Sequence, residues 1–310
     1  MCGIAGIIHK NSETADIGSQ MTAMLQSMKH RGPDSTGYAL FGPQSDQIVI
    51  RFTLADANDN RDFRFNERLE RNRIEVESRL AKIGATVDRV EGETDYAYRA
   101  VVTYGGEVKP LTDYLEDVPG CEVLSIGHAL EIIKDLGDAA TVADQYHLGG
   151  FDGTHAIGHV RMATESDVDI SGAHPYWAYP FNAVAVVHNG QLTNYFHWKR
   201  RLERSGHRFQ SECDSEIIAV YLAQKLDEGL NLEAAMHESL DDLDGVFTYM
   251  CVTADALGVA KDEMAAKPLV LYESDDVVAM ASEEIAIRAL IDHEIDTYDP
   301  YEREVLVFTR

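Results

Sequence analysis

The chain has few of the residues and segments that would indicate disulfides, metal sites or a membrane span. Its 310 residues include 4 cysteines, Cys2, Cys121, Cys213 and Cys251, and no two of them form a CxxC pair. This scatter argues against a zinc site and against a disulfide framework. No apolar run approaches the length needed to span a membrane, and no basic segment followed by an apolar one indicates a signal peptide. We therefore expect a soluble, cytoplasmic protein.

Positive charge is also scarce. The sequence has 27 Lys and Arg residues against 53 Asp and Glu residues, which gives a formal net charge of −26. A protein that binds phosphate backbones needs a basic face, so this balance argues against nucleic acid as a partner. The acidic residues are spread along the chain, and two interpretations stay open: a solvated surface adapted to a salty cytoplasm, or a docking surface for a basic subunit.

The first unusual feature is a cysteine at the second position. If Met1 is removed, the thiol and the free α-amine lie on the same residue, Cys2. An α-amine has a pKa of about 8, so part of the population can accept a proton near neutrality. One residue would then supply both a nucleophile and its general base. Taken alone this feature is weak, because a cysteine near the start of a chain is commonly incidental.

Apolar spacing predicts a layered α+β core on both sides of an inserted lobe, and 310 residues are enough to bury such a core. We place the core at residues 1–43 and 151–310. Strands are expected at residues 2–8, 38–41, 154–161, 183–187, 246–253, 257–260, 269–273 and 277–282. Helices are expected at residues 17–28, 194–205, 215–228, 232–240 and 282–290.

The character of the sequence changes between residues 44 and 150, where we place an inserted α+β lobe that serves as an assembly surface. Its expected order is a strand at 47–54, a helix at 66–83, strands at 86–90 and 96–104, a weak helix at 111–115 and a strand at 122–126. This β-α-β-β-α-β order is typical of a ferredoxin-like sandwich. A further helix is expected at residues 128–136.

Three candidate site segments are ambiguous when each is taken alone. Arg161 ends a predicted strand, and its planar guanidinium suits a carboxylate, although a surface salt bridge is the simpler alternative. Asn189 and Gly190 offer an amide and an N–H that could converge on an oxyanion, but Asn-Gly is also a turn dipeptide. Asp214 precedes an apolar helix and could hold an ammonium group, although Asp214 or Ser211 could equally be an ordinary N-cap.

Taken together, these segments and Cys2 resemble the class II, N-terminal-nucleophile type of glutamine amidotransferase domain, and they occur in the family's order. The matching pieces are Cys2-Gly3-Ile4-Ala5-Gly6, His30-Arg31-Gly32-Pro33-Asp34, Gly158-His159-Val160-Arg161-Met162-Ala163-Thr164, Ala173-His174-Pro175, His188-Asn189-Gly190 and Ser211-Glu212-Cys213-Asp214-Ser215-Glu216. The fold class that follows is α+β, a four-layer αββα N-terminal-nucleophile hydrolase core with an inserted ferredoxin-like lobe.

The resemblance implies a role for each matching residue. Cys2 would attack the side-chain amide of L-glutamine with its own α-amine as base, and Asn189 and Gly190 would form the oxyanion hole. Arg161 would grip the substrate's α-carboxylate and Asp214 its α-ammonium. Two further positions, Thr164 and His174, would line the pocket. A thioester would form, ammonia would leave, and water would release glutamate.

Other stretches indicate a branch of this family. Residues 180–190, 267–269 and 279–283, with the insert ending at 134–137, resemble the stand-alone amidotransferase subunit of glutamate-synthase-like complexes. The chain has no room for a synthase domain after the core, so we expect the ammonia to be used by another polypeptide or released. The resemblance implies a glycine-repeat β-helix subunit and an FMN-containing synthase subunit as partners. It implies no cofactor or metal in this chain. FMN is expected in the partner subunits, and whether they also hold an iron–sulfur cluster stays open.

Several alternatives stay open at this point. The product of the complex could be glutamate from 2-oxoglutarate, or N-methylglutamate from methylamine and glutamate, which would make this chain the amidotransferase-like subunit of N-methylglutamate synthase. The subunit would be structural and non-hydrolysing if Met1 is retained, because Cys2 would then lack a free α-amine. A stand-alone glutaminase is a third possibility.

Overall fold

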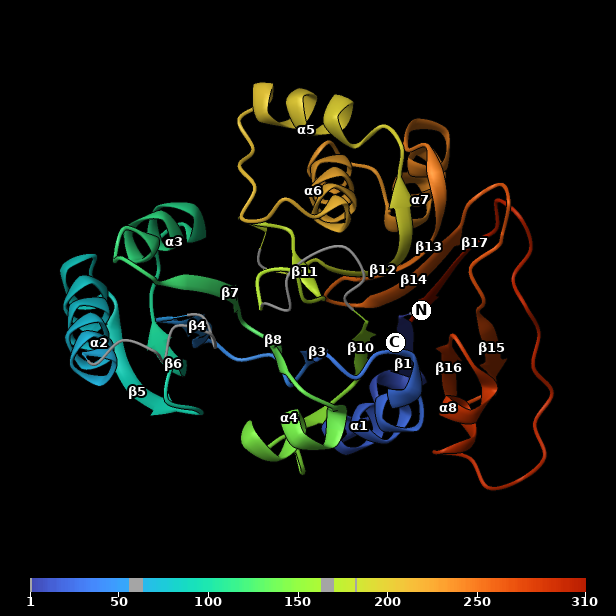
Figure 1. The fold of residues 1–310 in the computed structure, drawn as a ribbon, viewed down its shortest axis with the longest axis horizontal. Helices are drawn as coiled ribbons and strands as arrows, with labels where there is room; N and C mark the ends of the chain where they lie inside the picture. Colours follow the sequence, from blue (N-terminus) through green and yellow to red (C-terminus); the bar gives the residue numbers. More distant parts are fainter. Residues whose placement is uncertain (1, 56–63, 163–169, 182) are drawn as a thin grey trace.

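Two antiparallel sheets form the centre of the protein (Figure 1). The structure is a computed structural model that describes residues 2–55, 64–162, 170–181 and 183–310. The six-stranded sheet has the order β15 (Val270–Glu273), β16 (Val277–Ala281), β1 (Gly3–His9), β10 (His155–Arg161), β3 (Ser35–Phe41) and β8 (Leu130–Leu136). The five-stranded sheet has the order β11 (Tyr176–Trp177), β12 (Ala185–Leu192), β13 (Gly245–Val252), β14 (Ala256–Lys261) and β17 (Val305–Thr309).

Helices cover the outer face of each sheet (Figure 1). The helices α1 (Ile17–Ser27), α4 (Ala139–Gln145) and α8 (Glu284–Arg288) pack on the six-stranded sheet. The helices α6 (Asp214–Asp227) and α7 (Leu232–Asp242) pack on the five-stranded sheet, and α5 (Tyr195–Arg204) packs on α6. The predicted four-layer αββα core is therefore confirmed. None of the helices in the described part of the chain combines the length and apolar character that crossing a membrane requires.

The alternation of side chains along β1 explains how one short strand holds two layers together. Ile4 and Ile8 pack in the core between the two sheets, whereas Ala5 and Ile7 face the opposite way, into the core under α1. All four side chains are buried, because β1 has β10 on one side, β16 on the other and a layer on each face. The residue just before β1 is consequently held in place by a strand that is buried on both faces.

The inserted lobe is a separate four-stranded antiparallel sheet with two helices. Its elements are β4 (Ile48–Thr53), α2 (Phe65–Lys82), β5 (Thr86–Gly92), β6 (Ala97–Thr103), α3 (Val108–Glu116) and β7 (Glu122–Gly127). The sheet order is β5-β6-β4-β7, which is the arrangement of a ferredoxin-like sandwich and confirms that prediction. The core of the lobe is continuous with the core between the two main sheets. The domain bounds at residues 44 and 150 stay a prediction.

The predicted helix at residues 128–136 is wrong, because this segment is β8, which pairs with β3 at the edge of the six-stranded sheet. Its charged residues occur at helical spacing, yet they are buried. Glu131 accepts hydrogen bonds from Arg51 and Arg99, and Asp135 accepts from tyrosine hydroxyls of neighbouring elements. Because both faces of the strand are covered, the alternation that identifies a half-buried strand is absent from its sequence.

Candidate active site

Cys2 lies directly before β1, at the end of the six-stranded sheet where β10 finishes. Gly3 pairs with Val160 in the ladder between β1 and β10, so Cys2 lies beside the residues that follow Val160. The backbone N–H of Met162 donates to the sulfur of Cys2 over 3.4 Å. The thiol is partly exposed, and Arg161, which ends β10, is the residue before this donor. The structure therefore brings Cys2 and Arg161 to the same end of the sheet.

The carbonyl of Cys2 is held by a buried arginine. Arg31 donates from Nε to the Cys2 oxygen over 3.0 Å and from Nη1 to Glu283 Oε1 over 2.6 Å. His30 Nε2 lies 3.0 Å from the other oxygen of Glu283. Burial raises the pKa of the Glu283 carboxyl, but the hydrogen bonds and charges of Arg31 and His30 outweigh burial and lower it. Arg31 is thus oriented by an ionised partner, with its guanidinium directed at the backbone of Cys2.

The loop that carries Arg31 approaches β10 so closely that it needs a glycine. A Cβ on Gly32 would lie 2.5 Å from the carbonyl carbons of Val160 and Arg161. The sequence predictions used residues 30–34 only as part of the resemblance and assigned no role to Arg31. The detectable signal was an arginine next to a Gly-Pro pair in that motif, but its burial and its contact with Cys2 depend on the folded arrangement of β1 and β10.

Asn189 and Gly190 lie inside β12, so the alternative that they form a turn is wrong. The amide nitrogen of Asn189 lies 3.2 Å from the carbonyl oxygen of Cys2 and 3.3 Å from Ser282 Oγ, and it donates to both. Ser282 Oγ also accepts from the backbone N–H of Ile4 over 3.0 Å. Asn189, from the five-stranded sheet, therefore reaches across to the start of β1, and Ser282 is a second contact that the sequence predictions did not assign.

Gly190 is required by the neighbouring strand. Its φ is +138°, and a Cβ at this position would lie 2.1 Å from the carbonyl oxygen of Val246 in β13. Both observations exclude a side chain here, because a positive φ is disfavoured for other residues and the space is already filled. The close approach of β13 holds the Asn189-Gly190 peptide at a defined position beside Cys2.

His174 lies in a buried cluster with two other histidines. The rings of His159 and His174 stack with their centroids 4.1 Å apart. Ser215 Oγ lies 2.7 Å from His174 Nε2 and 2.8 Å from His188 Nδ1, so the single hydroxyl joins both rings. Burial lowers the pKa of His159 to about 3 and lowers those of His174 and His188. These rings therefore stay neutral near pH 7 and form a buried wall beside Arg161 and Asn189, because His159 lies in β10 and His188 in β12.

Asp214 is the first residue of α6, and its side chain bonds to β12 rather than capping its own helix. Oδ2 accepts from the backbone N–H of Leu192 over 2.7 Å, and Oδ1 lies 3.7 Å from His188 Nδ1. The N-cap position belongs to Cys213, so the alternative that Asp214 is an N-cap is wrong. Asp214 stays partly exposed beside the strand that carries Asn189 and Gly190, and its negative charge is favoured at the start of a helix.

The described residues thus bring five predicted positions into one region. Cys2, Arg161 and Asn189 lie at the β1–β10 end, with Gly190 next to Asn189, and Asp214 bonds to the same strand two residues beyond Gly190. His174 contributes to the buried wall and is connected to Asp214's helix through Ser215. Thr164 lies outside the described residues.

Comparisons of this chain with known proteins agree on one family. Residues 159–289 match the family described as glutamine amidotransferase domain. A putative glutamine amidotransferase of Methanothermobacter thermautotrophicus is 37% identical over 309 residues, which cover 98% of this chain and 99% of that protein. The glutamine amidotransferase-like protein GlxB of Rhizobium meliloti is 34% identical over 296 residues, covering 95% of this chain and 93% of that one.

A solved structure shares the fold. The glutamine phosphoribosylpyrophosphate amidotransferase of B. subtilis, in a complex with ADP and GMP, superposes with a TM-score of 0.61 and 19% sequence identity. The superposition covers 99% of this chain and 47% of that chain, so the present chain spans about half the length of that structure. At this identity the likeness shows the fold alone, which is the predicted N-terminal-nucleophile hydrolase fold.

Proposed function

Because the chain belongs to the glutamine amidotransferase family, we propose that it hydrolyses L-glutamine to glutamate and ammonia through a thioester on Cys2. The observation that carries this proposal is the position of the Cys2 sulfur, partly exposed and 3.4 Å from the N–H of Met162. The thiol in turn donates to the carbonyl oxygen of Met162 over 3.7 Å, so the backbone of Met162 holds the nucleophilic atom in place. Two further donors, from Arg31 and Asn189, hold the carbonyl of the same residue and fix its orientation.

The proposed reaction starts after Met1 has been removed. The free α-amine of Cys2 takes the thiol proton, and the thiolate attacks the amide carbon of the glutamine side chain. The resulting ammonium returns its proton to the departing nitrogen, so that ammonia leaves and a thioester remains. Water then gives a proton to the amine, attacks the thioester and releases glutamate with the thiol restored.

The oxyanion of each tetrahedral intermediate needs donors, and the structure supports Asn189 and Gly190 for this role. Asn189 Nδ2 donates to Cys2 O and Ser282 Oγ over 3.2 and 3.3 Å, so one of these long bonds would be exchanged for the oxyanion. Gly190 follows Asn189 directly in β12, and we assign its backbone N–H as the second oxyanion donor.

Recognition of a free amino acid needs one cation and one anion. We assign Arg161 to the α-carboxylate of glutamine, because it ends β10 directly before the donor to the Cys2 sulfur. We assign Asp214 to the α-ammonium group, because it is partly exposed and held by the strand that carries the oxyanion donors. Thr164 and His174 complete the proposed pocket, His174 through the neutral wall described above.

We propose further that the chain passes nitrogen to a partner synthase subunit in the cytoplasm, in a glutamate-synthase-like complex with a glycine-repeat β-helix subunit. FMN and an iron–sulfur cluster would then belong to the partners. The formal charge of −26 supports a docking surface for a basic subunit. The acceptor, 2-oxoglutarate or methylamine with glutamate, is decided by the chains and products that copurify with this subunit.

The proposal is tested by intact mass and by paired assays on the complex. The mature protein should lack Met1, and an acid quench during turnover should show a glutamyl adduct on the peptide that contains Cys2. In Cys2→Ala, glutamine-dependent synthesis should fall by about 10³-fold or more, while ammonia- or amine-dependent synthesis persists. Cys121→Ala removes a buried thiol from the lobe and serves as the control. Retention of Met1, or full glutaminase activity in Cys2→Ala, would contradict the mechanism.

A further inference from the structure

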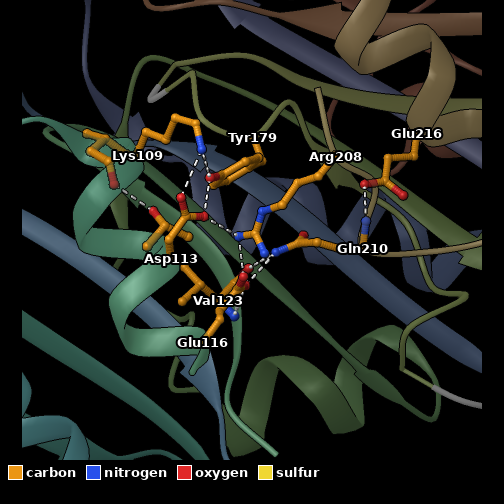
Figure 2. Close-up of polar contacts among 10 residues, drawn as sticks. Lys109, Asp113, Glu116, Val123, Tyr179, Arg208, Gln210 and Glu216 are labelled. Atoms are coloured by element: carbon orange, nitrogen blue, oxygen red, sulfur yellow. Dashed lines mark hydrogen bonds and ion pairs between the residues drawn. The ribbon is translucent and has the colours of Figure 1, made fainter. Parts of the chain in front are cut away.

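The inserted lobe contacts the core through a polar junction that lies outside the catalytic residues (Figure 2). Helix α3 of the lobe presents Asp113 and Glu116, and the segment 208–213, which leads into α6, presents Arg208 and Gln210. Arg208 pairs with both carboxylates, its Nη2 lying 3.2 Å from Asp113 Oδ1 and in a hydrogen bond with Glu116 Oε2. The junction therefore joins the lobe to the segment that directly precedes Asp214.

Glu116 is the centre of this junction. One of its oxygens, Oε1, accepts from Gln210 Nε2 over 2.6 Å and from the backbone N–H of Val123 over 3.1 Å, while the other accepts from Arg208. Its side chain is 11% exposed, so these bonds are largely shielded from water. Burial lowers the pKa of the Arg208 guanidinium, but the adjacent Glu116 outweighs burial and raises it. The guanidinium consequently stays charged, and Glu116 binds the lobe strand and the core segment at once.

The contacts continue from Gln210 to the helix that carries Asp214. The backbone N–H of Gln210 donates to Glu216 Oε1 over 2.7 Å, and the N–H of Ser211 donates to Glu216 Oε2 over 2.8 Å. Ser211 Oγ also donates to this carboxylate and accepts from the N–H of Cys213. Glu216 is 1% exposed and lies two residues after Asp214 in α6. An unbroken series of bonds therefore connects Glu116 in the lobe with the first turn of α6.

We propose that Glu116 is a positioning residue for glutamine binding: through Arg208 and Gln210 it fixes the segment 208–213 and thereby the place of Asp214. This inference rests on the proposed function, because Asp214 is there assigned to the substrate's ammonium group. It gives the inserted lobe a role beyond assembly, since a displacement of α3 would alter the affinity of the core for glutamine. Asp214 has its own bond to Leu192, so loss of Glu116 weakens binding without abolishing it.

The test compares two neighbouring acidic residues at the end of α3. Glu116→Gln removes the charge that holds Arg208 and keeps the size of the side chain. Asp117→Asn removes the same charge from the next residue, whose side chain is 74% exposed and faces Arg79 instead. Both changes are made in the full chain on a Cys2→Ala background, and the dissociation constant for L-glutamine is measured by calorimetry. Two further variants, Arg208→Gln alone and Arg208→Gln combined with Glu116→Gln, complete a double-mutant cycle.

We expect Glu116→Gln to raise the dissociation constant about three- to tenfold and Asp117→Asn to leave it within about twofold. The combined effect of Arg208→Gln and Glu116→Gln should be less than the sum of their separate effects, because the two changes share the Glu116 contact, although Arg208→Gln also removes the pair with Asp113. With Cys2 intact, the KM for glutamine should rise in Glu116→Gln while kcat and ammonia-dependent synthesis stay unchanged.

Three results would overturn the inference in distinguishable ways. Equal affinities in Glu116→Gln and Asp117→Asn would show that Glu116 does not position the site. A lower melting temperature of Glu116→Gln with unchanged affinity would make the junction purely structural. No binding of glutamine to the Cys2→Ala parent would overturn the proposed function together with this inference.

Discussion

The buried histidines predict that this protein loses stability steeply below about pH 6.5. Burial lowers the pKa of His155 to about 4 and that of His159 to about 3. His155 is fully buried, stacks on Phe41 with centroids 4.3 Å apart, and lies 2.8 Å from Thr253 O through Nε2. In the unfolded chain each ring has a pKa of about 6.5. The unfolded chain therefore binds protons at these two rings at pH values where the folded chain leaves the rings neutral.

The sign and size of the effect follow from this difference. A histidine with a lowered folded pKa contributes full stability above about pH 6.5, and the contribution is lost as pH falls towards the folded pKa. Each ring changes the free energy of unfolding by up to about 1.4 kcal/mol per pH unit, a slope that is reached below the unfolded pKa. His155 and His159 together therefore remove about 3 kcal/mol between pH 6.5 and 5. His174 and His188 act in the same direction. Burial raises the pKa of Glu216, so this carboxyl takes up a proton more readily in the folded state. It therefore offsets at most one of the protons that the unfolded histidines bind.

A loss of this size is a large part of the 5–15 kcal/mol typical of a folded domain. Urea unfolding at intervals between pH 7 and 5, with the m-value held constant, measures the slope directly. His155→Gln should reduce the slope by about 1.4 kcal/mol per pH unit, whereas His237→Gln, at an exposed position on α7, should leave it unchanged. A stability that is flat between pH 6.5 and 5, or equal slopes in the two variants, would refute the reasoning.

Three substitutions test the site. Gly190→Ala should lower the free energy of unfolding by about 2 kcal/mol or more in urea titrations, because a Cβ would lie 2.1 Å from Val246 O at a φ of +138°. The control is Gly206→Ala, at a φ of +93° with open space around it, which should lower the free energy of unfolding by less. Arg31→Ala should lower kcat about tenfold or more, since the Cys2 carbonyl loses a charged donor, and an unchanged kcat would exclude that role. Asp214→Asn should raise the KM for glutamine about ten- to hundredfold with little change in kcat; unchanged affinity would make its assignment wrong.

Helical and strand periodicity was a reliable guide where an element has one buried face. The spacing of Ile17, Met21, Met24 and Leu25 predicts a helix, and all four side chains are fully buried in α1. The same argument failed for β8, because burial on both faces removed its alternation. The strand β17, at residues 305–309, was not predicted at all, although it completes the five-stranded sheet beside β14.

The candidate site shows a similar division. Cys2, Arg161, Asn189, Gly190 and Asp214 were found from residue types and motif order, and the described structure places them in one region. Arg31, Ser282 and Glu283 were not assigned roles, although they contact Cys2 or the residues that hold it. Their positions depend on β1 lying between β10 and β16, and no local pattern encodes that neighbourhood.

The sequence by itself therefore determined the local elements with one apolar face, the order of the ferredoxin-like lobe and the chemical groups of the site. Only the tertiary structure decided which segments meet: Arg31 with Cys2, Glu283 with Arg31, and Glu116 of the lobe with Arg208 of the core. The physical reason is the distance along the chain over which each effect acts. Propensity and periodicity act over a few residues, whereas strand neighbours and buried ion pairs are selected by the packing of the whole chain.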